Sequence, residues 1–135
     1  MATIRRFEEL EVWILSRELN LKIGKLIDNK NFEKNFRLIG QIEGSSGSIM
    51  DNIAEGFERG TKADFIRFLY YSKGSCSELR SQLYRALDRN YVSHEIFKEL
   101  SLLVTRISLM LYKLISYLCN SPIKGARQKE NICKK

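Results

Sequence analysis

The sequence is poor in the residues that build metal and disulfide sites. Its 135 residues include one histidine and three cysteines, and no two cysteines stand in a CxxC motif. Zinc sites need closely grouped Cys or His ligands, so we expect no metal and no other cofactor. Cys76, Cys119 and Cys133 are odd in number and far apart, which argues against a disulfide framework and for a reducing compartment. Cys76 lies on an apolar helical stripe and is expected to be a small core residue.

The residues needed for catalysis are equally scarce. Nucleophilic and general acid-base chemistry need a base held within hydrogen-bond reach of its partners. The only histidine, His94, stands at the predicted start of a helix, where capping accounts for it. Asp51 and Glu55 form an i,i+4 carboxylate pair, but no Glu-x-x-His pair completes the di-metal site that helical bundles can hold. We therefore expect a protein that is not an enzyme.

Long apolar runs are also missing. Uncharged stretches such as residues 114–123 fall far short of the roughly 20 residues that a bilayer span needs. At the amino terminus, three glutamates interrupt the apolar residues, which is unlike a secretory signal. The length suits a single domain. We expect a cytoplasmic protein with no membrane partner.

What the sequence does have is apolar residues at helical spacing, and these predict four helices at about residues 8–28, 34–58, 62–89 and 94–119. No credible strand pair is present. Helices of this length with short connections predict an all-α fold, an up-down-up-down antiparallel four-helix bundle over residues 1–120. Pro122 ends the last helix, and residues 121–135 form a basic tail. Phe32 and Phe36 are expected to pack the ends of the first connection onto the core.

The helix ends carry recognisable capping residues. Thr61 and Ser93 have the side chains preferred at the N-cap position. Gly60 and Asn90 suit the left-handed conformation that follows many helices. These residues place the second and third connections between helices.

The second predicted helix contains a segment, EGSSGS at residues 43–48, with the composition of a flexible linker. A break there is the alternative, because each glycine inside a helix costs about 1 kcal/mol relative to alanine. The apolar register continues through the segment in steps of four and three, at Leu38, Ile42, Ser45, Ile49, Asn52 and Gly56. We therefore predict a continuous helix in which small residues let a neighbouring helix approach closely, namely Gly44, Ser45, Gly47 and Ser48.

The third predicted helix carries two lines of residues. One is a heptad seam for the core, formed by Phe65, Leu69, Ser72, Cys76, Leu79, Leu83 and Ala86. The second line lies beside it over roughly 30 Å and consists of Lys62, Ile66, Tyr70, Lys73, Ser77, Arg80 and Tyr84. Two interpretations remain open for the second line. It is either buried against another subunit, or its cations meet phosphates while its tyrosines stack on bases.

The positive charge is unevenly distributed. The net charge of the chain is +7, and the tail holds +4 of it, from five basic residues and one acidic residue. The body of the protein therefore carries only +3. A tail of this kind is often only solubilising, so the charge alone does not establish nucleic-acid binding.

Several segments together resemble a known family. They are FEELEVW at 7–13, QIEGSSGSIMDNIAEGFERG at 41–60, DFIRFLYYSKGSCSELRSQLYRALDRNYVS at 64–93, and the closing helix. Over about residues 7–118 they resemble the four-helix-bundle proteins of the 23S rRNA intervening-sequence family. The most specific piece is NIAEG, which contains Asn52, Glu55 and Gly56. The chain departs from many relatives where it has Glu43 and Gly44 instead of two arginines, and Met50 instead of proline.

The resemblance implies a homo-oligomeric ring, a pentamer among the expected sizes, that binds nucleic acid or protein and has no known catalysis. Members are often labelled ribosomal because their reading frames lie in inserts of some bacterial rRNA genes. A similar bundle is the accessory protein of diversity-generating retroelements, so a reverse transcriptase is one protein partner that the resemblance suggests. The loss of the two arginines lowers the phosphate affinity expected at that surface.

These observations lead to one functional expectation and one alternative. We expect a non-enzymatic, oligomeric protein that binds structured RNA, or DNA, through phosphates. The expected contacts are Arg5, Arg6, Lys62, Arg67, Lys73, Arg80, Lys124 and Arg127. The oligomer interface is expected at Ile66, Tyr70, Ser77 and Tyr84. The alternative is a protein-interaction scaffold that does not touch nucleic acid.

Overall fold

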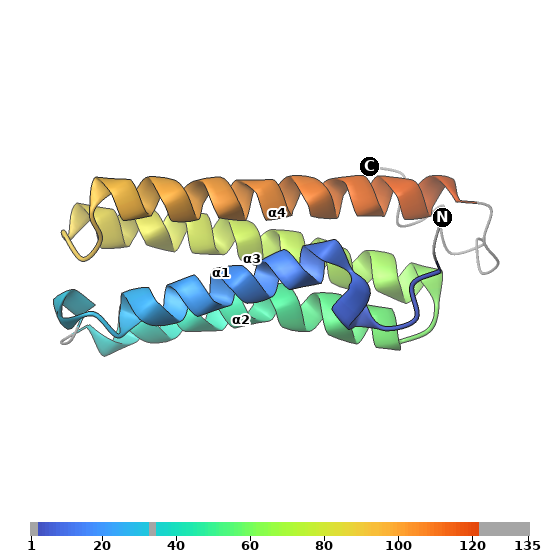
Figure 1. Cartoon of the computed structure of the whole chain (residues 1–135), viewed down its shortest axis with the longest axis horizontal. Helices are drawn as coiled ribbons and strands as arrows, with labels where there is room; N and C mark the ends of the chain where they lie inside the picture. The colour runs from blue at the N-terminus through green and yellow to red at the C-terminus, as the bar shows by residue number, and fades with distance from the viewer. Residues whose placement is uncertain (1–2, 33–34, 122–135) are drawn as a thin grey trace.

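The computed structural model describes residues 3–32 and 35–121, which form a bundle of four long helices (Figure 1). The helices are α1 (Glu11–Ile27), α2 (Phe36–Glu58), α3 (Lys62–Asp88) and α4 (His94–Asn120), with short 3-10 turns at Phe7–Glu9 and Lys30–Phe32. Consecutive helices run in opposite directions and pack on one another, and α1 also packs on α4 to close the bundle. No strand occurs in these residues. The predicted all-α, four-helix architecture is confirmed.

The predicted helix caps are present. The hydroxyl of Thr61 accepts a hydrogen bond from the Asp64 amide at 3.1 Å, and that of Ser93 accepts one from the Ile96 amide at 3.2 Å. Asn35 caps α2 in the same way. Gly60 and Asn90 have φ angles of 83° and 62°. Both residues thus adopt the left-handed conformation expected of them.

The glycine-serine segment is helical, as predicted, and two of its serines attach it to neighbouring helices. The Ser45 hydroxyl donates to the Glu78 carboxylate on α3 at 3.2 Å, whereas the Ser46 hydroxyl donates to the Asn20 side chain on α1 at 2.9 Å. The packing role predicted for Gly44 and Gly47 is wrong, because a Cβ added to either would meet no atom within 4 Å. These two glycines lie on the outer side of α2.

The core contains the predicted α3 seam, from Leu69 to Ala86, and the corresponding face of α4. Phe32 is fully buried, as expected. Phe36 is 78% exposed, so its predicted packing is wrong. Its position directly after the N-cap points the side chain away from the bundle axis.

Two cysteines lie in the described residues and differ in state. Cys76 is free and buried in the core. Cys119 is disulfide-bonded. The expectation that the cysteines form no disulfide is therefore wrong for Cys119. Cys133 lies outside the described residues.

Helix α4 has a wider apolar surface than the core uses. Several of its large apolar side chains are exposed, namely Ile96, Leu102, Leu109, Tyr112 and Tyr117. By length and composition it is apolar enough to cross a membrane, and within residues 3–32 and 35–121 it alone has this property. The apolar character of α4 is not apparent from the lengths of the uncharged stretches in the sequence, because Arg106 and Lys113 divide the helix into shorter ones. One such helix is weak evidence for a span, and the buried side of α4 packs on α1 and α3.

Candidate nucleic-acid interface

The second line of α3 lies along the seam between α3 and α4, and its first two members are not on the surface. Ile66 is fully buried in the core of the chain itself, so it is not offered to another subunit as predicted. Lys62 is also buried, and its ammonium group donates to the backbone carbonyl of Ser121 at 2.7 Å. Its predicted phosphate contact is therefore wrong. Both positions thus face the interior of the bundle.

The remaining members lie at the surface on the α3 side of the seam between α3 and α4. The Lys73 ammonium group donates to the Ser108 hydroxyl at 3.2 Å and lies 5.9 Å from the centre of the Tyr112 ring. The rings of Tyr84 and Phe97 lie 4.8 Å apart. Tyr70, Ser77, Arg80 and Tyr84 are exposed, and Lys73 is partly exposed. We call this surface the α3/α4 groove, meaning only the exposed seam between the two helices, defined by Tyr70, Lys73, Ser77, Arg80 and Tyr84 with Ser108 and Tyr112.

The α3/α4 groove is positively charged without local compensation. Neither Lys73 nor Arg80 forms an ion pair with any described residue, and the seven residues that define the groove include no carboxylate. The ion pairs that the described residues form involve side chains outside the α3/α4 groove. Neither charge is therefore neutralised by a paired carboxylate, which favours contact with phosphate.

The other predicted cations lie outside the α3/α4 groove. Arg67 is paired with Asp64 in the first turn of α3, and Arg6 lies 3.8 Å from Glu9. Arg5 is exposed, and its backbone amide donates to Glu9. Lys124 and Arg127 lie outside the described residues. The predicted contacts are thus not one surface, and only Lys73 and Arg80 come together.

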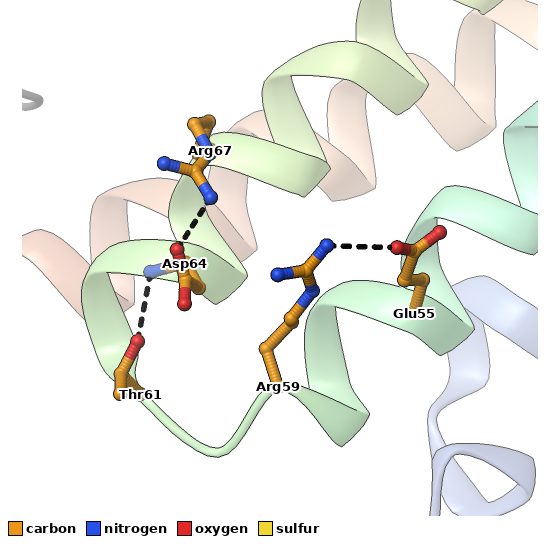
Figure 2. A network of polar contacts seen from close by, with 5 residues as sticks. All are labelled: Glu55, Arg59, Thr61, Asp64 and Arg67. Atoms are coloured by element: carbon orange, nitrogen blue, oxygen red, sulfur yellow. Dashed lines mark hydrogen bonds and ion pairs between the residues drawn. The ribbon is translucent and has the colours of Figure 1, made fainter.

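The connection between α2 and α3 carries polar contacts among Glu55, Arg59, Thr61, Asp64 and Arg67 (Figure 2). Arg59 pairs with Glu55 at 3.1 Å, and Arg67 with Asp64. The two guanidinium groups lie 4.9 and 5.6 Å from the centre of the Phe68 ring. Each arginine has a carboxylate partner, so the network carries little net charge. It fixes the geometry of this turn.

The NIAEG residues have structural roles. The Asn52 amide donates to the backbone carbonyl of Ser48, one turn earlier, at 2.8 Å. Glu55 holds Arg59. A Cβ on Gly56 would lie 2.6 Å from the Cβ of Phe68, so the glycine allows α2 and α3 to approach closely. The most family-specific segment of the sequence thus builds the fold.

The sequence did not reveal the α4 half of the groove. Ser108 and Tyr112 were not singled out, because the apolar seam of α4 dominates its pattern. Their four-residue spacing places them on one face of the helix, but only the packing of α4 on α3 shows which face meets Lys73. Residues 3–32 and 35–121 contain no group of three or more His, Cys, Asp or Glu that could hold a metal.

Comparisons with known proteins point to one family. A family model described as 23S rRNA-intervening sequence protein matches residues 8–113. The chain is also similar to a crystal structure from Bacteroides thetaiotaomicron, described as a protein with unknown function from the S23 ribosomal protein family. The identity is 27% and the TM-score 0.71, over 77% of this chain and 97% of that one. No curated protein matches.

Proposed function

The chain belongs to the 23S rRNA-intervening sequence protein family, and from this premise we propose that it is a non-enzymatic, homo-oligomeric protein that binds structured RNA through phosphate contacts. The α3/α4 groove is the proposed binding surface. The observation that carries the proposal is the pair of cations, Lys73 and Arg80, that have no carboxylate partner and lie among tyrosines.

The spacing of the groove supports a polyanion as its ligand. Lys73 and Arg80 are seven residues apart, about 10 Å along the helix at 1.5 Å per residue. A nucleic-acid strand carries one phosphate per nucleotide, so both cations can contact a single backbone. Tyr70, Tyr84 and Tyr112 flank them with rings that can stack on unpaired bases or pack on sugars.

The proposal is tested by the salt dependence of RNA binding. Filter binding to a structured RNA at two salt concentrations should show weaker affinity at high salt. The double variant Lys73→Ala/Arg80→Ala should lower the slope of log K against log salt by roughly 2, because each lost phosphate contact removes about one unit. A duplex DNA of equal length shows whether the groove selects RNA.

A matched control removes two other cations. Lys25 and Arg89 are exposed and form no ion pair with a described residue. The variant Lys25→Ala/Arg89→Ala has the same net charge as the groove variant and should leave the slope nearly unchanged. Equal losses in both variants would point to non-specific attraction and contradict the assignment of the groove.

The second candidate function is a protein-interaction scaffold, with a reverse transcriptase among the partners that the family resemblance suggests. The exposed tyrosines of the groove favour it, because Tyr is enriched in protein interfaces. If RNA does not bind at low salt and Lys73→Ala/Arg80→Ala dissociates the oligomer, the scaffold function replaces RNA binding. The predicted interface residues Tyr70, Ser77 and Tyr84 would then be the subunit contact.

A further inference from the structure

The outer face of α4 has two leucines that the bundle does not bury. Leu102 is 62% exposed and Leu109 is 52% exposed. They are seven residues apart and so lie on one face, with Arg106 and Lys113 at the intervening and following turns. The outer face of a bundle helix is normally polar. Leucines at heptad spacing are what a helix presents when it packs against another helix.

The outer face of α2 has the opposite character. Gly40, Gly44 and Gly47 lie along it, and a Cβ at any of the three would meet no atom within 4 Å. Together with Glu43, Ser48 and Asp51 these glycines line a shallow depression. No side chain therefore covers the backbone of α2 at these three glycines, and the carboxylates of Glu43 and Asp51 lie beside them.

The two faces match in spacing. On α4, Leu102, Arg106, Leu109 and Lys113 advance by four, three and four residues. On α2, Gly40, Gly44, Gly47 and Asp51 advance by the same steps. Each set spans about 16 Å along its helix. A leucine side chain fits where the facing helix has only glycine, as small residues permit close approach of two helices.

The two faces also match in charge. Arg106 and Lys113 on α4 and Glu43 and Asp51 on α2 form no ion pair with any described residue. We propose that the outer face of α4, defined by Leu102, Arg106, Leu109 and Lys113, docks on the outer face of α2, defined by Gly40, Glu43, Gly44, Gly47 and Asp51, of a second copy of this chain.

The two faces cannot meet within one chain. Both α2 and α4 pack on α3, and both pack on α1, so they occupy opposite corners of the bundle. Because the two contacting faces differ, a pair of copies has one unused face at each of its ends. Further copies can add at these ends, and the assembly becomes a ring when the rotation between neighbouring copies brings the last copy back to the first. The inference rests on the homo-oligomeric part of the proposed function and leaves the α3/α4 groove open to RNA.

Charge reversal tests the docking directly. Sedimentation and native mass should show that Arg106→Glu/Lys113→Glu weakens association at least tenfold, and that Glu43→Lys/Asp51→Lys does the same. Mixing the two variants should restore assembly, because each supplies the face that complements the other. Far-UV circular dichroism should show that both variants stay helical.

A steric variant separates docking from folding. Gly44→Leu places a side chain in open space within the monomer, so it should leave the helix intact while blocking the leucines of the partner. Gly74→Leu is the matched control, because Gly74 on α3 is equally open and lies outside both faces. It should assemble as the unmodified chain does.

Two results would overturn the inference. One is a wild-type chain that stays monomeric at tens of micromolar. The other is assembly that survives both Gly44→Leu and Arg106→Glu/Lys113→Glu. Filter binding of RNA to the same variants keeps the two proposals apart. If assembly responds as expected and RNA does not bind, the docking stands and only RNA binding by the groove fails.

Discussion

Gly56 sets the distance between α2 and α3. A Cβ there would lie 2.6 Å from the Cβ of Phe68 and 3.3 Å from a ring carbon of Phe65. The Cβ of Phe68 is attached to the backbone and cannot rotate away, so α3 itself would have to move. The sequence placed Gly56 on the apolar register of this helix, and the structure shows why a residue without a side chain is needed there.

Gly56→Ala should therefore lower the free energy of unfolding by about 1–3 kcal/mol, the usual cost of overpacking. This loss outweighs the gain of about 1 kcal/mol that alanine brings to a helix. Urea unfolding gives the difference. Gly74→Ala, at an exposed and open helical position, should instead raise stability by up to about 1 kcal/mol. A stabilising Gly56→Ala would contradict the close packing.

Cys76 makes the stability of the protein sensitive to alkaline pH. Burial raises the pKa of its thiol to about 12, and the nearby cations Lys73 and Arg80 offset only part of this effect. In the unfolded chain the thiol has a pKa near 8.5. Between these values the unfolded state loses the proton while the folded state keeps it, so unfolding becomes more favourable as pH rises.

The free energy of unfolding should thus fall by up to about 1 kcal/mol per pH unit between pH 9 and 11 from this residue. Below about pH 7 the thiol should contribute almost no pH dependence, because it is protonated in both states. Denaturant unfolding at several pH values, compared with Cys76→Ala, isolates the contribution because other groups titrate in both proteins. Identical alkaline slopes in the two proteins would show that Cys76 ionises without opening the core.

At the level of the helices, sequence periodicity predicted the architecture well. The steps of four and three through EGSSGS predicted that α2 is continuous, and the structure confirms it. The side on which the glycines lie was predicted wrongly, because small residues carry little information about burial. Hydrogen bonds from Ser45 and Ser46 to α3 and α1 hold the segment in place, and no local pattern indicates such partners.

Hydrogen exchange should show this continuity of α2. Backbone amides of residues 44–48 should exchange slowly, with protection comparable to that of the adjoining turn at residues 49–53. The amides of His94 and Glu95 serve as an exposed reference, because the first turn of a helix has no internal acceptors for them. Exchange of residues 44–48 as fast as this reference would mean that the segment opens as a hinge.

At the scale of the whole molecule, the sequence could predict which residues share a helical face but not which faces meet. It placed Lys73 and Arg80 on one line with Tyr70 and Tyr84, and they do share a groove. It also placed Lys62 and Ile66 on that line, yet both are buried, and Lys62 donates a hydrogen bond to the residue after α4. The α4 half of the groove depends on packing between helices, which one-dimensional periodicity does not encode.

The hydrogen bond from Lys62 to Ser121 ties the start of α3 to the end of α4. At the opposite pole, the contact of Tyr84 with Phe97 and the tight turn at Asn90 hold the same two helices together. The two helices are thus joined near both of their ends. We therefore expect the proposed binding surface between α3 and α4 to keep the same backbone arrangement with and without a ligand.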